Sequence, residues 1–131
     1  MTYVDGYIVP VPEDRLEDYK KIASGAGALW IEHGALSYKE CVLEDAEPEM
    51  PEDCPADMRP ALFKDLMGTK DGETVIFAFV TYKSREHRDE VNAKVMSDPR
   101  MEEACGSDMD GGMPFDCARM AFGGFSAFVD L

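Results

Sequence analysis

Two kinds of hydrophobic periodicity alternate along the first half of the chain. Residues 3–11 alternate with a period of two, which predicts a strand. One face of this strand carries Tyr3, Asp5, Tyr7 and Val9. From residue 13, apolar residues recur every three or four positions as far as residue 33, and Gly34 follows, so we expect a helix over 13–33. Residues 35–43 alternate again and predict a second strand.

The second half repeats this order. Residues 74–82 are almost all β-branched or aromatic, and because both faces are apolar we expect a central strand. Ser84 is placed to cap a helix that ends near residues 98–99. Residues 118–129 predict a last strand, interrupted by Gly123 and Gly124, where a bulge or a close backbone approach is the usual cause.

The resulting order, β-α-β-β-α-β, is that of the ferredoxin-like arrangement. We therefore expect an α+β fold, a single domain over residues 1–131 whose four-stranded antiparallel sheet carries both helices on one face. Residues 47–71 are acidic and contain four prolines, which predicts a long irregular excursion with at most a short helix near 61–67.

The other face of this sheet needs a cover. Large apolar side chains on the last two strands, such as Phe77, Phe79, Phe122 or Phe125, would otherwise form a bare patch. A second copy packed face to face would cover it by symmetry, so we expect a homodimer with eight strands in all.

Four segments also carry a family resemblance: YVDGYIVPVP at 3–12, EHGAL at 32–36, TYKSREHRDEVNAKVMSDPRM at 81–101 and MPFDCARMAFGGF at 113–125. Their order and separation resemble those of the YbaA-like bacterial proteins, catalogued as domain of unknown function 1428. The resemblance spans nearly the whole chain. It implies a dimeric α+β barrel related to small monooxygenase-like barrel proteins, with no established activity.

The net charge of the chain argues against some classes of binding partner. The 131 residues include 27 Asp and Glu against 13 Lys and Arg, a formal charge of -14, which repels phosphate backbones and anionic lipid. Uncharged stretches such as 74–82 and 121–129 are far shorter than the ~20 apolar residues of a membrane helix, and no export signal is evident. We expect a cytoplasmic protein that binds neither nucleic acid nor membranes.

Cysteine spacing and motif content argue against metals and cofactors. The four cysteines, at positions 41, 54, 105 and 117, form no pair with zinc-site spacing. Neither a phosphate-binding glycine loop nor a dinucleotide fingerprint is present. We therefore expect no metal and no cofactor, and Cys41 is interpreted as a small buried residue of its strand.

The candidate catalytic residues are His33, His87 and Tyr38. His33 ends the apolar stripe of the first helix and His87 begins that of the second, so both rings are expected to lean toward the sheet. A histidine pair there, with Tyr38 or Asp5, would bind a small polar ligand or transfer a proton. The alternative is that each histidine is satisfied locally by a carbonyl or a carboxylate.

The candidate ligand-binding residues are Trp30, His33, Tyr38, Arg119 and Asp5. Trp30 either packs in the core or stacks on a ligand. Arg119 is expected within the last strand, where it forms a structural ion pair with Asp5 or Asp116 or binds a carboxylate. Arg85 and Arg88 are expected to form exposed ion pairs.

Three functions remain open. The first hypothesis is a homodimeric small-molecule-binding or regulatory protein that holds an apolar or polar organic ligand between sheet and helices. The second is a cofactor-free enzyme, monooxygenase-like or isomerase-like, that uses a histidine in that cavity. The third is a protein whose only partner is itself. The fold is compatible with all three.

Overall fold

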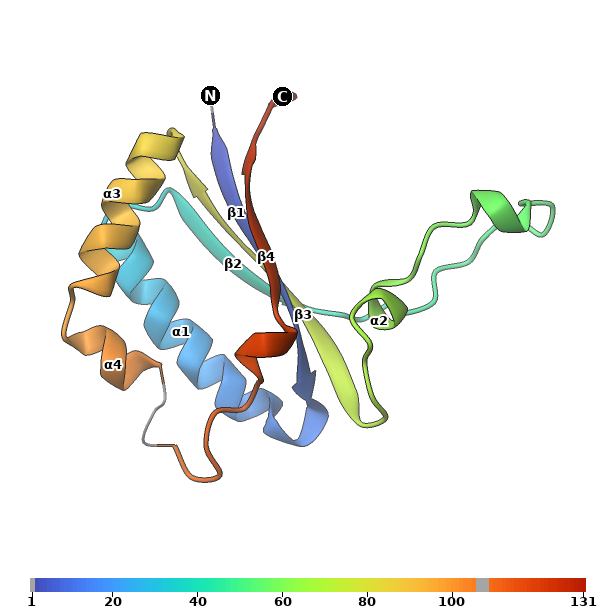
Figure 1. Cartoon of the computed structure of the whole chain (residues 1–131), viewed down its shortest axis with the longest axis horizontal. Coiled ribbons are helices and arrows are strands. Elements are labelled where there is room, and N and C mark those ends of the chain that lie inside the picture. Colours follow the sequence, from blue (N-terminus) through green and yellow to red (C-terminus); the bar gives the residue numbers. More distant parts are fainter. Residues whose placement is uncertain (1, 106–108) are drawn as a thin grey trace.

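A four-stranded antiparallel sheet forms the centre of the protein (Figure 1), seen in a computed structural model that describes residues 2–105 and 109–131. The strands are β1 (Tyr3–Pro12), β2 (Ser37–Val42), β3 (Glu73–Tyr82) and β4 (Ala121–Ser126). Their order in the sheet is β2-β3-β1-β4, and each neighbouring pair is antiparallel. The α+β, ferredoxin-like prediction is confirmed, including the central position of the strand predicted at 74–82.

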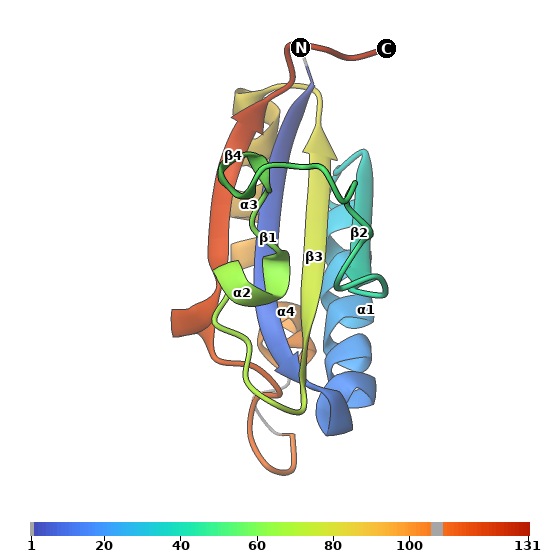
Figure 2. The same ribbon diagram turned by 90° about the vertical axis from the view of Figure 1, so that its right-hand side faces the viewer.

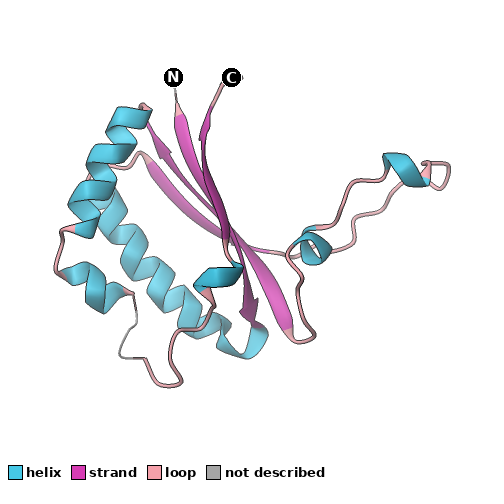
Figure 3. Cartoon of the chain, viewed as in Figure 1, coloured by secondary structure: helices cyan, strands magenta, loops and turns pink. Residues whose placement is uncertain are grey.

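Three α-helices cover one face of the sheet (Figures 1 and 3). They are α1 (Leu16–Glu32), α3 (Arg85–Met96) and α4 (Arg100–Ala104), and a 3-10 turn, η1 (Glu13–Arg15), precedes α1. Gly34, at φ +116°, reverses the chain after α1 in a conformation that favours glycine. The Ser84 side chain accepts a hydrogen bond from the backbone N–H of His87, so the predicted cap is confirmed.

The face of the sheet beneath the helices, called here the inner face, is the better packed of the two. Odd-numbered residues of β1 and even-numbered residues of β3 point to it, as the predicted alternation requires. Val9 and Val80 are each 1% exposed, and Tyr82 is fully buried. The helices contribute Tyr19 and Val91, among others, to two apolar clusters on this side.

The opposite face, called here the outer face, carries Phe77 and Phe79 of β3 and Phe125 of β4. Phe77 is 43% exposed and Phe125 is 60% exposed. Cys41 of β2 lies opposite Phe77 in the register and is also exposed, so its expected burial is wrong. Strand β2 lies at the edge of the sheet, and Phe63, which contacts Phe77, leaves Cys41 exposed.

Strand β4 departs from expectation in two ways. It pairs with β1 residue for residue through Gly123 and Gly124, so there is no bulge, and Phe122 and Phe125 consequently lie on opposite faces. Phe122 stacks on Tyr7 at the inner face, with ring centroids 6.1 Å apart, which corrects its assignment to the bare patch. The predicted close approach does occur, because a Cβ on Gly124 would overlap the ring of Tyr3.

The long segment between β2 and β3 projects from the outer side (Figures 1 and 2). It contains a 3-10 turn, η2 (Ala56–Met58), and the predicted short helix, α2 (Phe63–Leu66). Phe63 contacts Phe77, with ring centroids 6.4 Å apart, so α2 covers one end of the outer face. Residues 43–62, called here the arm, extend away from the sheet and leave the rest of that face open.

Candidate functional site

A cavity of about 410 Å³ lies between the helices and the inner face. Five aromatic side chains and several methionines dominate its lining, including Tyr7, Tyr19, Trp30, Tyr38, Met101 and Met120. These residues come from β1, α1, β2, α4 and the segment before β4. A concave, mostly apolar site with few polar groups is typical of small-molecule binding.

The position of Tyr38 in the cavity depends on a glycine in α1. A Cβ built on Gly27 would lie 2.6 Å from Cδ1 of Tyr38, so only glycine lets the ring lie against the helix. The Tyr38 ring then reaches Trp30, with centroids 6.0 Å apart. The cost of a glycine inside a helix is offset here by placing two aromatic rings side by side.

A carboxylate joins two of the tyrosines. Glu40 Oε1 accepts a hydrogen bond from the Tyr19 hydroxyl at 2.6 Å, and Oε2 accepts one from the Tyr38 hydroxyl at 2.7 Å. Burial, followed by the hydrogen bond to Glu40, raises the pKa of Tyr19 well above its usual range. Burial and then the charge of Glu40 do the same for the pKa of Tyr38. Both phenols therefore remain protonated donors.

Glu40 also borders a second space. A groove of about 710 Å³ between α1 and β2 shares Tyr19, Tyr38 and Glu40 with the inner cavity. Lys20 borders this groove, but its ammonium group pairs with Glu17 at 3.1 Å. The three hydrogen-bonded side chains therefore stand where the groove meets the cavity.

Hydrogen bonds to Asn92 and from Arg15 fix two further parts of the cavity lining. The Trp30 indole N–H donates to Asn92 Oδ1 at 3.1 Å, and the Tyr82 hydroxyl donates to the same oxygen at 3.3 Å. Arg15 donates to the backbone carbonyls of Gly111 at 3.0 Å and Gly112 at 2.8 Å. Arg15 thus holds the loop that leads to the cavity residues of the segment before β4.

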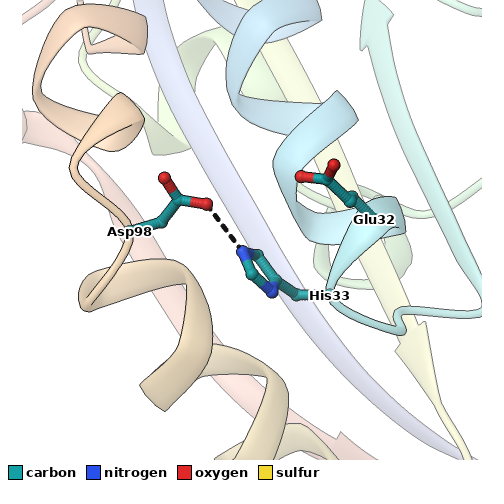
Figure 4. A group of neighbouring side chains, drawn as sticks. All are labelled: Glu32, His33 and Asp98. Atoms are coloured by element: carbon teal, nitrogen blue, oxygen red, sulfur yellow. Dashed lines mark hydrogen bonds and ion pairs between the residues drawn. The ribbon is translucent and has the colours of Figure 1, made fainter.

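His33 does not lie where the sequence predicted. Its Nε2 is 2.8 Å from Asp98 Oδ2, in the connection between α3 and α4 (Figure 4), and the ring is not among the groups that line the cavity. His33 is the C-cap of α1, with φ -85° and ψ 1°, so the helical periodicity ends at this residue. The alternative of local satisfaction by a carboxylate is the one that the geometry supports.

The same corner offers a group of possible metal ligands. Single ligand atoms of Glu32, His33 and Asp98 lie within 4.8 Å of one another (Figure 4). Arg100 already forms ion pairs with both Glu32 and Asp98. The Arg100 guanidinium, and then His33, hold the pKa of Asp98 well below its usual range. A cation would have to displace Arg100 to bind here.

The candidates His87, Asp5 and Arg119 also lie outside the cavity lining. The backbone N–H of Lys83 donates to His87 Nδ1 at 3.0 Å, so this ring completes the turn before α3. Asp5, 4% exposed, pairs with Arg88 at 2.7 Å, which corrects the expectation that Arg88 is an exposed ion-pair residue.

Arg119 is a further correction. It lies in a 3-10 turn, η3 (Cys117–Arg119), before β4 begins, and not within the strand. Its guanidinium pairs with Glu73 at 2.6 Å, instead of with Asp5 or Asp116. Asp116 instead accepts a hydrogen bond from the backbone N–H of Ala118, which caps this turn. A structural ion pair is therefore the role that the geometry of Arg119 supports.

Of the predicted site residues, Trp30 and Tyr38 are brought together in the cavity. Sequence reasoning missed Glu40, although a signal was present: Glu40 shares a strand face with Tyr38, two residues earlier, and a carboxylate on an apolar face is uncommon. Arg15 left no comparable signal, because its carbonyl partners lie more than ninety residues away along the chain.

Over 130 residues the chain is 40% identical to the uncharacterized protein YbaA of Escherichia coli K12 and to YbaA of Shigella flexneri, with 99% of each chain covered. A mutant of SnoaB, a cofactor-independent oxygenase from Streptomyces nogalater, aligns with a TM-score of 0.48 and 12% identity, covering 99% of this chain and 94% of that one.

The described helices include none with the length and hydropathy to cross a membrane. Residues 2–117 match a family described as protein of unknown function (DUF1428). Together with the relatives that share 40% identity along the chain, this match shows that the protein belongs to the DUF1428 family.

Proposed function

We propose that this protein is a homodimer that binds a small, largely apolar organic molecule between its helices and its sheet. The observation that carries the proposal is the cavity of about 410 Å³, lined by Tyr7, Trp30, Tyr38 and methionines. Aromatic and methionine side chains suit an apolar ligand, since methionine adapts its shape and aromatic rings supply large contact areas.

The enzyme hypothesis depended on a histidine in the cavity. His33 is paired with Asp98, and His87 accepts a hydrogen bond from the Lys83 backbone, so within the described part of the chain neither ring lines this space. The ionisable groups of the lining are Glu40, tyrosines whose pKa values are raised, and the cysteines at 105 and 117. This inventory favours binding over proton transfer at neutral pH.

The outer face supports the homodimer. Phe77, Phe79 and Phe125 form an apolar surface that α2 covers at one end only. A second copy applied face to face would bury these rings in both subunits at once. The arm projects from the same side and carries Met50 and Met58, both exposed, which a partner subunit would also cover (Figure 2).

Trp30 provides a direct test, because it is the single tryptophan and it lines the cavity. We expect the neutral dye N-phenyl-1-naphthylamine to bind and to accept energy from Trp30 fluorescence. Ala26→Met, at a buried lining position of α1, should fill the cavity and abolish the transfer. Ala93→Met places the same side chain at an exposed position of α3 that is not among the lining residues of the cavity or the groove, and it should leave dye binding intact.

Absence of energy transfer in the unmodified protein would contradict the proposal, as would equal binding by both variants. Far-UV circular dichroism of each variant checks that the helices remain. Native mass spectrometry of protein purified from its own host should show a dimer with a retained small molecule, and a bare monomer would contradict both parts.

A further inference from the structure

The cavity has an asymmetric charge. Glu40 is the one acidic side chain among its described lining residues, and the same lining contains no lysine, arginine or histidine. Within residues 2–105 and 109–131, no basic side chain forms an ion pair with Glu40. Its partners are the hydroxyls of Tyr19 and Tyr38, which are neutral. The carboxylate is thus held in place without a counter-charge.

Glu40 retains capacity for a ligand. Each of its oxygens accepts one phenol hydrogen bond, at Oε1 from Tyr19 and at Oε2 from Tyr38, and a carboxylate oxygen can accept a second. The two phenols fix the orientation of the carboxylate, so little conformational entropy is lost when a ligand group binds it.

The rings around this carboxylate suit a positive charge. Tyr38 and Trp30 lie side by side at a tilt of 37°, and Tyr7 lines the same space. The face of an aromatic ring attracts an ammonium group, most strongly when water is excluded. An anion would meet both Glu40 and a chain of formal charge -14, whereas that charge raises the local concentration of cations.

We infer that the ligand is an organic cation, an amine or quaternary ammonium on an apolar body, whose charged end sits between Glu40 and the rings of Tyr38 and Trp30. This inference rests on the proposed binding function and names the class of ligand. The apolar body occupies the methionine-lined part of the cavity, and the groove between α1 and β2 is the route by which the charged end reaches Glu40.

Three probes with the same phenylpropyl body test the charge preference by isothermal titration calorimetry. They are the cation 3-phenylpropylamine, the neutral 3-phenyl-1-propanol and the anion 3-phenylpropionate. We expect the amine to bind at least about tenfold more tightly than the alcohol, since a desolvated cation–π contact together with a carboxylate exceeds 1.4 kcal/mol. The anion should bind more weakly than either.

Glu40→Gln keeps the shape and one acceptor oxygen but removes the charge. It should reduce amine affinity to about that of the alcohol, while alcohol binding persists and shows that the cavity is intact. Glu90→Gln makes the same change at an exposed position of α3 and controls for net charge, so it should alter amine affinity less than about twofold.

The outcomes separate the two proposals. If the neutral dye binds but the amine binds no more tightly than the alcohol, the cation inference is wrong and the proposed function stands. An amine affinity that is unchanged by Glu40→Gln overturns the inference in the same way. If neither the dye nor any phenylpropyl compound binds, both proposals are wrong.

Discussion

The two faces of the sheet share the same four strands but differ in how completely the chain covers them. On the inner face Val80 and Tyr82 are almost completely buried, and the buried acid Asp5 has a basic partner in Arg88. On the outer face Phe77 and Phe125 keep about half of their surface exposed. Adjacent residues of one strand thus meet a closed core and an open surface.

The difference teaches that the chain completes only one face by itself. Its helices close the inner face around a cavity along β1 and β3 but leave Phe122 of β4 exposed, whereas the exposed rings of the outer face need a partner or remain exposed. Ligand binding and subunit association would then occupy opposite sides of one sheet. If this division holds, the largest loss of stability should come from breaking the buried pair of Asp5 and Arg88 on the inner face.

The largest effect is expected at the inner face. Arg88→Met leaves the Asp5 carboxylate buried without its partner at 2.7 Å and removes the guanidinium from the Tyr3 ring. We expect a loss of about 3 to 5 kcal/mol in the free energy of unfolding, measured by urea denaturation. Arg85→Met, at an exposed position one turn earlier, should cost less than about 0.5 kcal/mol.

Pairing the substitution with Asp5→Asn refines this test. The double variant should recover part of the loss, because no buried charge then remains without a partner. If Arg88→Met cost no more than Arg85→Met, the claim that Arg88 stabilises the buried Asp5 carboxylate would be wrong.

The next effect concerns the outer face. Phe125→Ser removes a ring that is 60% exposed in the single chain and would be buried between two copies. We expect the dimer to dissociate about 30-fold more readily, corresponding to about 2 kcal/mol, in sedimentation equilibrium. Phe122→Ser removes a ring that is 77% exposed on the same strand but lies on the inner side. It should leave association unchanged.

Equal effects of these two variants would show that the outer face is not the interface. A well-behaved monomer at tens of micromolar would show that this face has no second copy as its partner.

A smaller effect is expected where α1 meets Tyr38. Gly27→Ala would place a methyl group 2.6 Å from the Tyr38 ring. The hydrogen bond from the Tyr38 hydroxyl to Glu40 holds this ring in place. We expect a loss of about 1 to 2 kcal/mol and weaker dye binding, because the ring must move into the cavity. Gly25→Ala meets Ala104 at an ordinary 3.7 Å and should instead stabilise the helix by up to about 1 kcal/mol. Two stabilising alanines would contradict the described position of Tyr38.

Much of this fold was predictable from local pattern. A period of two identifies the strands and the face of β1 that carries Asp5 and Tyr7, and it does so without knowledge of any partner. The cap at Ser84 and the stop at Gly34 are similarly local, because each depends on residues within one helical turn. Trp30 and Tyr38 were predicted to face the space between helices and sheet from local periodicity as well.

The sequence predictions were wrong where the direction of a side chain depends on residues that are distant along the chain. His33 was placed by helical periodicity, but the helix ends there, and its ring turns to Asp98, which is 65 residues away. Arg88 could not be matched to Asp5, 83 residues distant, before the packing of α3 on the sheet was known. Phe122 was assigned to the wrong face because it lies three positions before Phe125, an odd spacing that places both rings on one side only if a bulge intervenes.

The smallest effect is expected at the ion pair where the chain returns from the arm into β3. Arg119 donates to both oxygens of Glu73, at 2.6 and 2.8 Å, and to the carbonyl of Gly68 at 3.1 Å. The Arg119 guanidinium, helped by the Lys70 backbone N–H, lowers the pKa of Glu73 to about 2. A lowered pKa means that the pair stabilises the fold above the ordinary glutamate pKa and that this contribution is lost as the pH falls toward 2.

Glu73→Gln should therefore be less stable than the unmodified protein at pH 6, with a difference that shrinks between pH 4.5 and 2 in urea titrations. Glu90→Gln, exposed on α3, should give a pH dependence parallel to that of the unmodified protein. A difference at Glu73 that stayed constant down to pH 2 would mean that Arg119 does not hold this carboxylate in its charged form, and that the outer end of the sheet is fastened by other contacts.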